Sequence, residues 1–420
     1  MNERRGTAMR VAHINVTSEL STGKIALGIC ESLQQNGHAA LLCYARGGIP
    51  EGVPGYRIGS RWDTLVHAGL ARFFDCAGFL SRRATRRLAR QLALYKPDIV
   101  HLHNLHGYYL NLPILMETLR DAEIPVVWTL HDCWPFTGHC AHYSMAGCIR
   151  WRAGCHHCPN LRQYPASYLL DRSKPNWLRK RDCITALRDL TLVAPSRWLA
   201  GEAQKSFLGG YPVRVLPSGI DLEAFRPADS EAVEEITERY GLRRHGDKPV
   251  ILSVASAWRA AKGINDLMDL QEILKDEAVI AVVGMTPKQM EYLPPEMIAI
   301  PMLYNAETLR ALYSAARLYI SLSYEESQGL TLVEAMACGT QVLCYDQTAL
   351  PELVTGETGM AVPTRDLQGV ADACRKLIAE PKSPDACRAH ACLFDKEVQF
   401  EKYVRVYEEL ADYEAPAQPE

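Results

Sequence analysis

Two glutamates with a glycine between them are the residues of this sequence most suited to ligand binding. Glu326 and Glu334 are eight positions apart, and Gly329 lies between them. Gly329 would allow close backbone approach where a helix is expected to begin, and the free N–H groups of a helix N-terminus favour an anion. Glu334, one turn into that helix, could accept two hydrogen bonds from a diol such as a ribose. For a pair of glutamates alone, the alternative is a solvated acidic loop and a surface glutamate.

A cluster of cysteines suggests metal chemistry. The chain has 14 cysteines, and five of them lie between Cys133 and Cys158. In a reducing compartment this indicates metal binding or catalysis before disulfides. We expect four thiolates spaced C-x7-C-x6-C-x2-C to form a closed structural zinc site, which would pin an insertion with few apolar anchors. The alternatives are reduced cysteines without metal, an iron–sulfur cluster, disulfides, or nearby histidines as substitute ligands. The expected ligands are Cys140, Cys148, Cys155 and Cys158.

A basic stretch suggests a surface for lipid. Residues 61–90 contain seven arginines and two aspartates, with apolar residues interleaved. A basic amphipathic surface of this kind could make a peripheral contact with an anionic membrane leaflet. The alternative is a solvated helix packed by its apolar stripe. The apolar residues are Leu65, Val66, Leu70, Phe73, Phe74, Phe79 and Leu80.

The composition is that of a globular protein. At about 150 residues per domain, 420 residues predict two to three domains. With 48% hydrophobic residues the chain can bury a sizeable core, and a net charge of −3 gives no indication of nucleic acid binding. We find no apolar run of about 18 residues and no signal-peptide core, so we expect a cytoplasmic protein.

Strand-like and helix-like stretches alternate along the chain, which predicts an α/β fold of two Rossmann-like, doubly wound domains with parallel strands. One expected strand ends directly before His131 and Asp132. A polar, charged stretch then separates two series of elements. The expected parts are a first domain over 1–222 with a Cys-rich insertion over 133–160, a linker over 223–248, a second domain over 249–397 and a last segment over 398–420.

Several stretches resemble, in order, the motifs of the family 4 glycosyltransferases. Residues 215–221 read VLPSGID, residues 255–263 read ASAWRAAKG, and residues 325–339 read EESQGLTLVEAMACG, which is similar to the family's E-x7-E signature. Two further stretches are similar to glycosyltransferases of the colanic-acid and other exopolysaccharide types. These are WTLHDCWPFTGHC over 128–140 and GCHHCP over 154–159.

The resemblance implies a GT-B fold with an interdomain cleft, the donor mainly on the second domain, and a last helix that packs back on the first. It implies a retaining transfer of a hexose from a UDP- or GDP-type sugar to a lipid-linked saccharide acceptor at the inner face of the cytoplasmic membrane. The product would be exopolysaccharide, capsule or O-antigen. No cofactor is expected for catalysis, and no residue can be assigned as a nucleophile.

The same resemblance implies roles for individual residues. Lys262 is the expected cation at the donor phosphates, and Arg259 is the candidate second cation because the family's usual arginine position is Ala257 here. Arg259 could equally be a solvated loop charge, and His131 a satisfied histidine at a strand end. The expected catalytic residues are His131, which would contact the donor sugar, and Glu326, which would bind its hydroxyls. The expected donor-binding residues are Gly23, Arg259, Lys262, Gly329, Leu330 and Glu334.

Two other functions fit parts of this pattern. A GT-B sugar-nucleotide epimerase would use the same donor site without an acceptor. A non-catalytic, zinc-stapled scaffold of a polysaccharide-assembly complex would need neither Glu326 nor Lys262 intact. We find no D-x-D tripeptide, which disfavours a metal-dependent transferase of the other main fold, and no G-x-G, which disfavours a dinucleotide-binding oxidoreductase.

Overall fold

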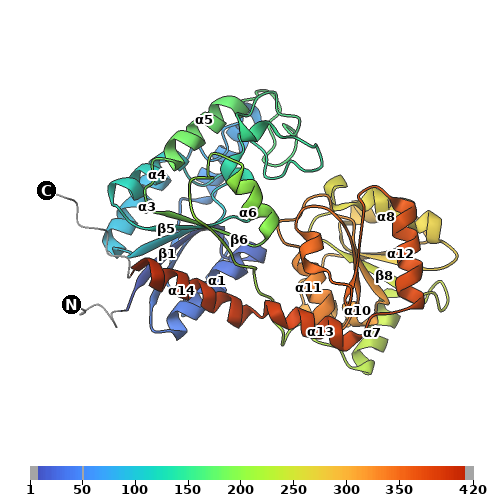
Figure 1. The fold of residues 1–420 in the computed structure, drawn as a ribbon. Helices are drawn as coiled ribbons and strands as arrows, with labels where there is room; N and C mark the ends of the chain where they lie inside the picture. The colour runs from blue at the N-terminus through green and yellow to red at the C-terminus, as the bar shows by residue number, and fades with distance from the viewer. Residues whose placement is uncertain (1–7, 50–51, 412–420) are drawn as a thin grey trace. The chain divides into compact units, whose positions relative to one another are not determined.

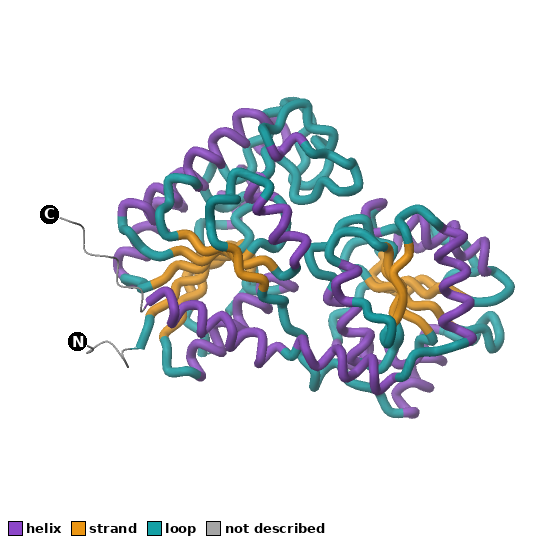
Figure 2. The backbone as a smooth tube through the Cα atoms, in the orientation of Figure 1, coloured by secondary structure: helices purple, strands orange, loops and turns teal. Residues whose placement is uncertain are grey.

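A computed structural model describes residues 8–49 and 52–411. The chain forms two compact units (Figure 1). The first extends to Pro217 and takes in the chain again from Glu397, and the second spans Ser218–Lys396. Each unit contains a parallel sheet between layers of helices, as Figure 2 shows. The prediction of an α/β fold with two Rossmann-like units is confirmed.

Within the described residues, the sheet of the first unit has seven parallel strands in the order β3-β2-β1-β4-β5-β6-β7. Helices α1 and α14 cover one face, and α3, α4 and α5 cover the other (Figure 1). The strands are β1 Arg10–Thr17, β2 Ala39–Arg46, β3 Gly55–Arg57, β4 Ile99–Leu102, β5 Val126–Thr129, β6 Leu190–Ala194 and β7 Val213–Val215. The helices are α1 Leu20–Gln35, α2 Arg61–Phe74, α3 Arg82–Tyr95, α4 Leu112–Asp121, α5 Ser173–Ile184, α6 Arg197–Gln204 and α14 Lys396–Ala411.

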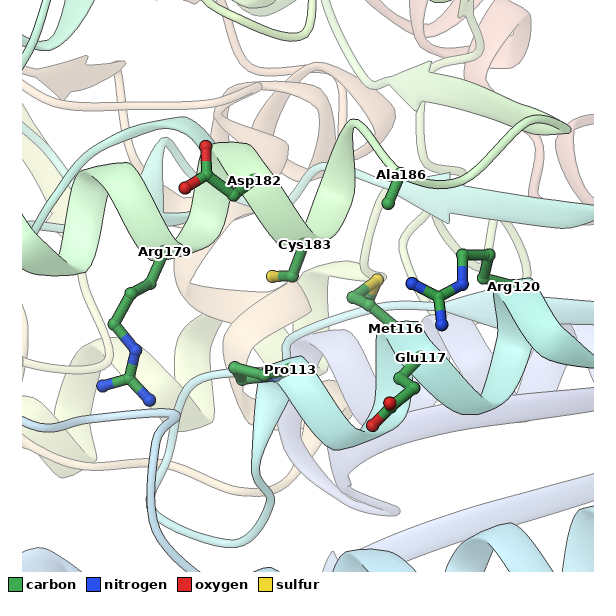
Figure 3. A pocket seen from close by; sticks show the side chains of 8 residues that line it. All are labelled: Pro113, Met116, Glu117, Arg120, Arg179, Asp182, Cys183 and Ala186. Atoms are coloured by element: carbon green, nitrogen blue, oxygen red, sulfur yellow. The ribbon is translucent and has the colours of Figure 1, made fainter.

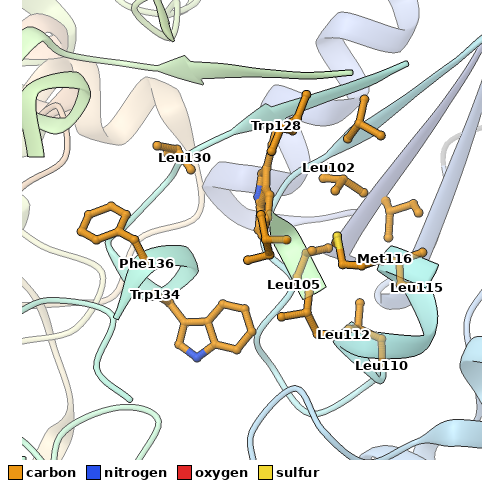
Figure 4. Close-up of a cluster of buried hydrophobic side chains, with 14 of the residues drawn as sticks. Leu102, Leu105, Leu110, Leu112, Leu115, Met116, Trp128, Leu130, Trp134 and Phe136 are labelled. Carbon is orange, nitrogen blue, oxygen red and sulfur yellow. The ribbon is translucent and has the colours of Figure 1, made fainter. Parts of the chain in front are cut away.

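Alternation along the strands sends successive side chains to opposite faces of this sheet. Ile14, Leu102 and Trp128 point toward the α3–α5 layer, where they join the large core drawn in Figure 4. Val11 and Val127 point to the other face and pack with α1 and α14. The same alternation therefore decides which polar strand residues share a face.

The Cys-rich insertion differs from the expectation of few apolar anchors. Trp134, Phe136, Tyr143 and Trp151 are buried and continue the core of the first unit. The aromatic rings contact one another, with centroids 5.1 Å apart for Phe136 and Trp151 and 4.9 Å apart for Tyr143 and Trp151. The insertion is thus anchored by large aromatic side chains as well as by any metal.

The second unit repeats the same plan, with six parallel strands among its described residues in the order β10-β9-β8-β11-β12-β13. Helices α8 and α12 cover one face, and α7, α10, α11 and α13 cover the other. The strands are β8 Val250–Val254, β9 Val279–Met285, β10 Ile298–Pro301, β11 Leu318–Ser321, β12 Val342–Tyr345 and β13 Gly359–Val362. The helices are α7 Ser230–Tyr240, α8 Ile264–Leu274, α9 Pro287–Met290, α10 Ala306–Ala315, α11 Leu330–Ala337, α12 Leu367–Ala379 and α13 Pro384–Ala391.

The boundaries of the units differ from the expected ones, because the first unit ends at Pro217 rather than at residue 222 and the second begins at Ser218. The segment 223–248, expected to be a linker, belongs to the second unit and contains α7. The many charged residues of this segment led to the prediction of a linker. The segment instead forms a helix whose apolar side, including buried Ile236, packs in the core of that unit. Asp229 caps this helix by accepting a hydrogen bond from the Ala232 N–H at 2.8 Å. At the other end of the chain, α14 packs on the first unit, where Phe400, Tyr403 and Tyr407 are buried.

Candidate functional site

The carboxyl ends of three neighbouring strands position the candidate site of the second unit. Strands β9, β8 and β11 lie side by side in the sheet, so the loops that follow them meet at one edge. This edge is where open parallel sheets bind ligands. The loop after β8 carries Arg259 and Lys262, and the loop after β11 carries Glu326 and Gly329.

Lys262 and Glu326 form an ion pair across these two loops. Lys262 Nζ lies 2.5 Å from Glu326 Oε1 and donates a second, longer hydrogen bond of 3.4 Å to the carbonyl of Glu325. Both side chains are partly exposed, at 32% for Lys262 and 22% for Glu326. Thr348 Oγ1 accepts a hydrogen bond from the Glu326 N–H at 3.2 Å, which ties this loop to the next one. The structure therefore places an ammonium and a carboxylate, 64 positions apart in sequence, together at the sheet edge.

Two glycines start the helices that leave this edge. Gly263 precedes α8 with φ +75°, and Gly329 precedes α11 with φ +95°. A Cβ on Gly263 would lie 2.1 Å from the carbonyl oxygen of Leu322, and one on Gly329 would lie 2.7 Å from Leu350. Only glycine suits both the left-handed backbone and the close packing. The first N–H groups of a helix have no partner within the helix, so the starts of α8 and α11 offer donors to an anion, which the helix dipoles also favour.

Glu334 lies one turn into α11 and accepts a hydrogen bond from the Tyr313 hydroxyl at 2.9 Å. Tyr313 is fully buried, and burial together with the Glu334 charge raises its pKa well above the ordinary value. Tyr313 thus holds the carboxylate as a neutral donor. Arg259, by contrast, is exposed and forms no salt bridge with any residue that the structure describes.

Two residues that the sequence analysis did not single out hold the loop after β11. Gln328 donates to the carbonyl of Ser218 at 3.0 Å and accepts from the Ser218 N–H at 2.9 Å. Asp266, in the first turn of α8, accepts from the hydroxyls of Tyr324 at 2.5 Å and Tyr345 at 2.6 Å. No local motif marks these contacts, because their partners are distant in sequence.

A hollow of about 660 Å³ opens beside this edge, between the ends of β8 and β9. Gly284, with φ +97°, closes the end of β9 so tightly that a Cβ would lie 1.8 Å from the carbonyl oxygen of Ala255. The sequence pattern gave no indication of this hollow. Its lining includes Ser256, Trp258, Thr286, Gln289, Tyr292 and Tyr304.

The first unit holds the other two residues expected to contact the donor. Gly23 is buried in α1, and a Cβ there would lie 2.5 Å from the Ser18 carbonyl carbon, so the helix packs closely on the chain before it. His131 follows β5 and is half-buried, with its Nε2 3.1 Å from His103 Nδ1. Asp132 binds His106 Nε2 at 2.6 Å and the Trp134 N–H at 2.8 Å. Burial opposes the charge of Asp132, but these partners outweigh it and lower its pKa to about 2.

The four cysteines expected to bind zinc lie near one another, but their sulfur atoms are not close enough together to bind one metal ion as they stand. Cys140 and Cys158 share a hydrogen bond, which lowers the pKa of Cys158. The only described trio of possible ligand side chains with donor atoms all within 4.8 Å of one another is His13, His101 and His103. The buried Lys180 lies close enough for its charge to act on Cys155 and Cys140, and it donates to the carbonyl of Trp134 at 2.6 Å.

The first unit also has a hollow on its surface. A hollow of about 400 Å³ lies between α4 and α5, lined by charged residues such as Glu117, Arg120 and Arg179 (Figure 3). It shares no element with the predicted site residues.

In the part of the chain over 8–49 and 52–411, no helix combines the length and the apolarity needed to cross a membrane.

Two glycosyltransferase family models match consecutive parts of the chain. The model described as Glycosyltransferase Family 4 matches residues 23–224, and the model described as Glycosyl transferases group 1 matches residues 248–380. Together with the two-unit fold, these matches show that the chain belongs to the GT-B glycosyltransferases and is an enzyme of that class.

Individual relatives extend this result. A protein of Escherichia coli (strain K12), named provisionally as the colanic acid biosynthesis glycosyl transferase WcaC, is 24% identical over 83% of this chain and 85% of its own length. A Bacillus subtilis (strain 168) protein, named provisionally as the teichuronic acid biosynthesis glycosyltransferase TuaC, is 30% identical over 43% of this chain and 45% of its own. The crystal structure of Anabaena HepE in complex with UDP-glucose superimposes with a TM-score of 0.66 over 96% of this chain and 100% of that chain, at 13% identity.

Proposed function

We propose that this glycosyltransferase transfers a hexose, with retention of configuration, from a UDP- or GDP-type sugar to a saccharide acceptor in the synthesis of a bacterial surface polysaccharide. The ion pair between Lys262 and Glu326 beside two helix N-termini carries the proposal. Support for a surface-polysaccharide pathway comes from the names of the E. coli and B. subtilis relatives, and support for a uridine nucleotide comes from the ligand of the Anabaena structure.

The chemistry requires that negative charge on the leaving diphosphate be stabilised as the sugar bond breaks. Lys262 can exchange part of its contact with Glu326 for a phosphate oxygen, and the N–H groups at the starts of α8 and α11 can donate to the others. Glu326 would then be available for the sugar hydroxyls. The hollow beside β9 offers Trp258, Tyr292 and Tyr304 to a planar base, and Glu334 remains the residue proposed for the ribose. His131 remains the histidine proposed to contact the donor sugar.

The experiment is a transfer assay with labelled UDP-glucose, UDP-galactose and GDP-mannose. The acceptors are lipid-linked saccharides. Transfer to acceptor is expected with one donor, and Glu326→Gln should reduce it at least about a hundredfold if the carboxylate acts in the transition state. Glu352→Gln, a glutamate of the neighbouring 350–353 turn, is the matched control and should keep parent activity. Conversion of a sugar nucleotide to its epimer without acceptor, or full activity of Glu326→Gln, would contradict the proposal.

A structural zinc ion is proposed for Cys140, Cys148, Cys155 and Cys158. The buried Lys180 is the observation that fits it: burial lowers the pKa of Lys180 to about 7, and nearby thiolates favour its charged form, which would offset the negative charge of a four-thiolate zinc site. The sulfur atoms must move together to bind the ion, since no three of them lie within 4.8 Å in the described structure. Metal analysis of chelator-free protein should give one zinc per chain, and less than about a tenth of an equivalent would reject the site.

The α2 face is proposed as a peripheral contact with anionic lipid. Trp62 is 76% exposed, Leu65 61% and Phe73 48%, and Leu169 of the adjoining segment is 67% exposed. That segment pairs with the end of α2, because Tyr168 and Leu170 donate backbone hydrogen bonds to Arg72 and Phe73. Phe79 was expected on this face but is buried, 4.3 Å beneath the guanidinium of Arg179.

Sedimentation with vesicles tests this contact. Binding to anionic vesicles is expected to fall with salt and to be lost in an Arg83→Glu, Arg86→Glu variant, because both are exposed arginines of the basic stretch, on the helix that follows α2. Arg405→Glu, an exposed arginine of α14, should bind as the parent does. Equal binding to neutral vesicles, or no salt dependence, would reject an anionic leaflet as the partner.

A further inference from the structure

Four histidines occupy one face of the sheet in the first unit. His13 lies on β1 and His101 on β4, His103 directly follows β4, and His131 lies two residues after the end of β5. The parallel register pairs His13 with His101, and His103 donates its backbone N–H to the carbonyl of Ile14. Because alternate strand residues share a face, the imidazoles stack on the side of the sheet that α14 covers.

Three of these imidazoles form a continuous hydrogen-bonded chain. His13 Nδ1 lies 3.2 Å from His103 Nε2, and His103 Nδ1 lies 3.1 Å from His131 Nε2. His13 and His103 are fully buried, whereas His131 is half-buried at the end of the chain. Burial lowers the pKa of His13 to about 3 and that of His131 to about 4, so the members of the chain are neutral near pH 7.

A neutral imidazole carries one N–H, so the chain can be ordered in two directions only. If His131 donates a hydrogen bond from Nε2, His103 must in turn donate from Nε2 to His13 Nδ1. His13 then carries its own N–H at Nε2, where it is buried. His13 Nε2 has no hydrogen-bond partner, and orphaned buried N–H groups are rarer than unused acceptors. The opposite order, in which His13 and His103 both donate from Nδ1, leaves only an unused lone pair there. In that order His131 receives at Nε2 and carries its proton on Nδ1.

The nitrogens of His13, His101 and His103 also lie close enough for a metal ion. His101, however, already uses both nitrogens: Thr129 Oγ1 lies 2.8 Å from Nε2, and the Tyr407 hydroxyl lies 2.6 Å from Nδ1. The trio also has no carboxylate ligand to offset a divalent charge in a buried setting. Hydrogen bonding therefore accounts for this arrangement better than metal ligation does.

We propose that His13 and His103 are positioning residues that fix His131 as its Nδ1–H tautomer, so that His131 offers a hydrogen-bond donor to an oxygen of the bound sugar. The inference deepens the proposed function and rests on it for the identity of the ligand. Nδ1 of His131 makes no hydrogen bond within the described residues, so its proton is available for a ligand.

Nuclear magnetic resonance of protein labelled with 15N-histidine tests the order directly, without reference to activity. Two-bond 1H–15N correlations distinguish the tautomers, and the His131 signal is assigned by its loss in His131→Asn. The expected result is Nδ1–H on His13, His103 and His131 in the parent protein. An Nε2–H tautomer of His131, an imidazolium in the chain, or a metal-bound nitrogen would overturn the proposal even if the enzyme transfers sugar as expected.

Kinetics of three variants separate positioning from a structural role. His103→Leu should lower kcat about tenfold or more with a smaller change in the donor KM, because the proton on His131 is no longer ordered. His103→Asn places an amide N–H near the former Nδ1 and should recover most of this loss. His67→Leu removes a buried histidine bonded to Ser81 and Cys76 outside the chain, and should leave kcat and the His131 tautomer unchanged. Equal losses in His103→Leu and His103→Asn would contradict the positioning role.

Discussion

At the residue scale, Lys262 and Glu326 are the side chains on which donor binding is proposed to depend. An ammonium held 2.5 Å from a carboxylate, and one third exposed, can turn to a phosphate oxygen without crossing a large desolvation barrier. Glu334 is held differently, because it accepts a hydrogen bond from the hydroxyl of the buried Tyr313. The two glutamates therefore have separate surroundings, which suits separate contacts with a sugar and with a ribose.

The buried histidines predict how stability changes with pH. Their folded pKa values lie below the ordinary value of 6.5, so the unfolded chain binds more protons than the folded chain as pH falls below 6.5. Unfolding free energy should be flat above that pH from this source and should fall below it, by up to about 1.4 kcal/mol per pH unit for each histidine.

Urea unfolding followed by tryptophan fluorescence measures this loss, because six of the seven tryptophans lie in the first unit. Comparison of pH 7.5 with pH 5 should show a shallower loss in His13→Leu, which removes one of the titrating groups. An equal loss in the parent protein and in His13→Leu would show that His13 is not held neutral in the folded state.

At the element scale, the helices that start at Gly263 and Gly329 position the anion-binding N–H groups. These starts could be predicted from the sequence, since a glycine after a strand and before an apolar helix is a local signal. The hydrogen bonds that hold the loop after β11 could not be predicted in this way. Gln328 reaches Ser218 across 110 positions and Asp266 reaches Tyr345 across 79, and no local pattern encodes such pairs.

Gly263→Ala tests the start of α8. The φ of +75° and a Cβ 2.1 Å from the Leu322 carbonyl oxygen require the backbone to move, at a cost of about 1–3 kcal/mol in unfolding free energy. Nucleotide binding should weaken with it. Gly201→Ala, at a helical glycine with open space around it, is the control and should be neutral or slightly stabilising. Unchanged unfolding and binding in Gly263→Ala would refute the role assigned to this turn.

At the scale of the whole molecule, the repetition of strand and helix sufficed to predict two parallel α/β units. The prediction failed where charge concealed structure, as in α7, and where aromatic residues anchor the Cys-rich insertion despite its polar composition. The histidine chain can be seen in part in the sequence, because His101 and His103 are two positions apart at the end of an apolar stretch, but only the register of β1 with β4 shows that His13 joins them.

Helix α14, which packs on the first unit, gives a prediction about the stability of that unit. Tyr403 of α14 is fully buried against that unit, so Tyr403→Ala should lower the unfolding free energy of the first unit by about 3–5 kcal/mol. Val398→Ala, at a position of the same helix that is 51% exposed, should have little effect. Tryptophan fluorescence reports the first unit, and retained nucleotide binding reports the second. Loss of both together at the same urea concentration would show that the two units do not unfold separately.

Calorimetric titration of the protein with UDP-glucose and GDP-mannose, in the parent and in Lys262→Met, tests whether Lys262 binds the diphosphate of the sugar donor. We predict one site per chain for one of the two donors, and an affinity at least about tenfold lower in Lys262→Met, because a charge-assisted contact with phosphate is lost. Lys275→Met, which removes an exposed lysine paired with Glu272, should bind as the parent does. Equal affinity in the parent and in Lys262→Met, or no binding of either donor, would contradict the site described for the second unit.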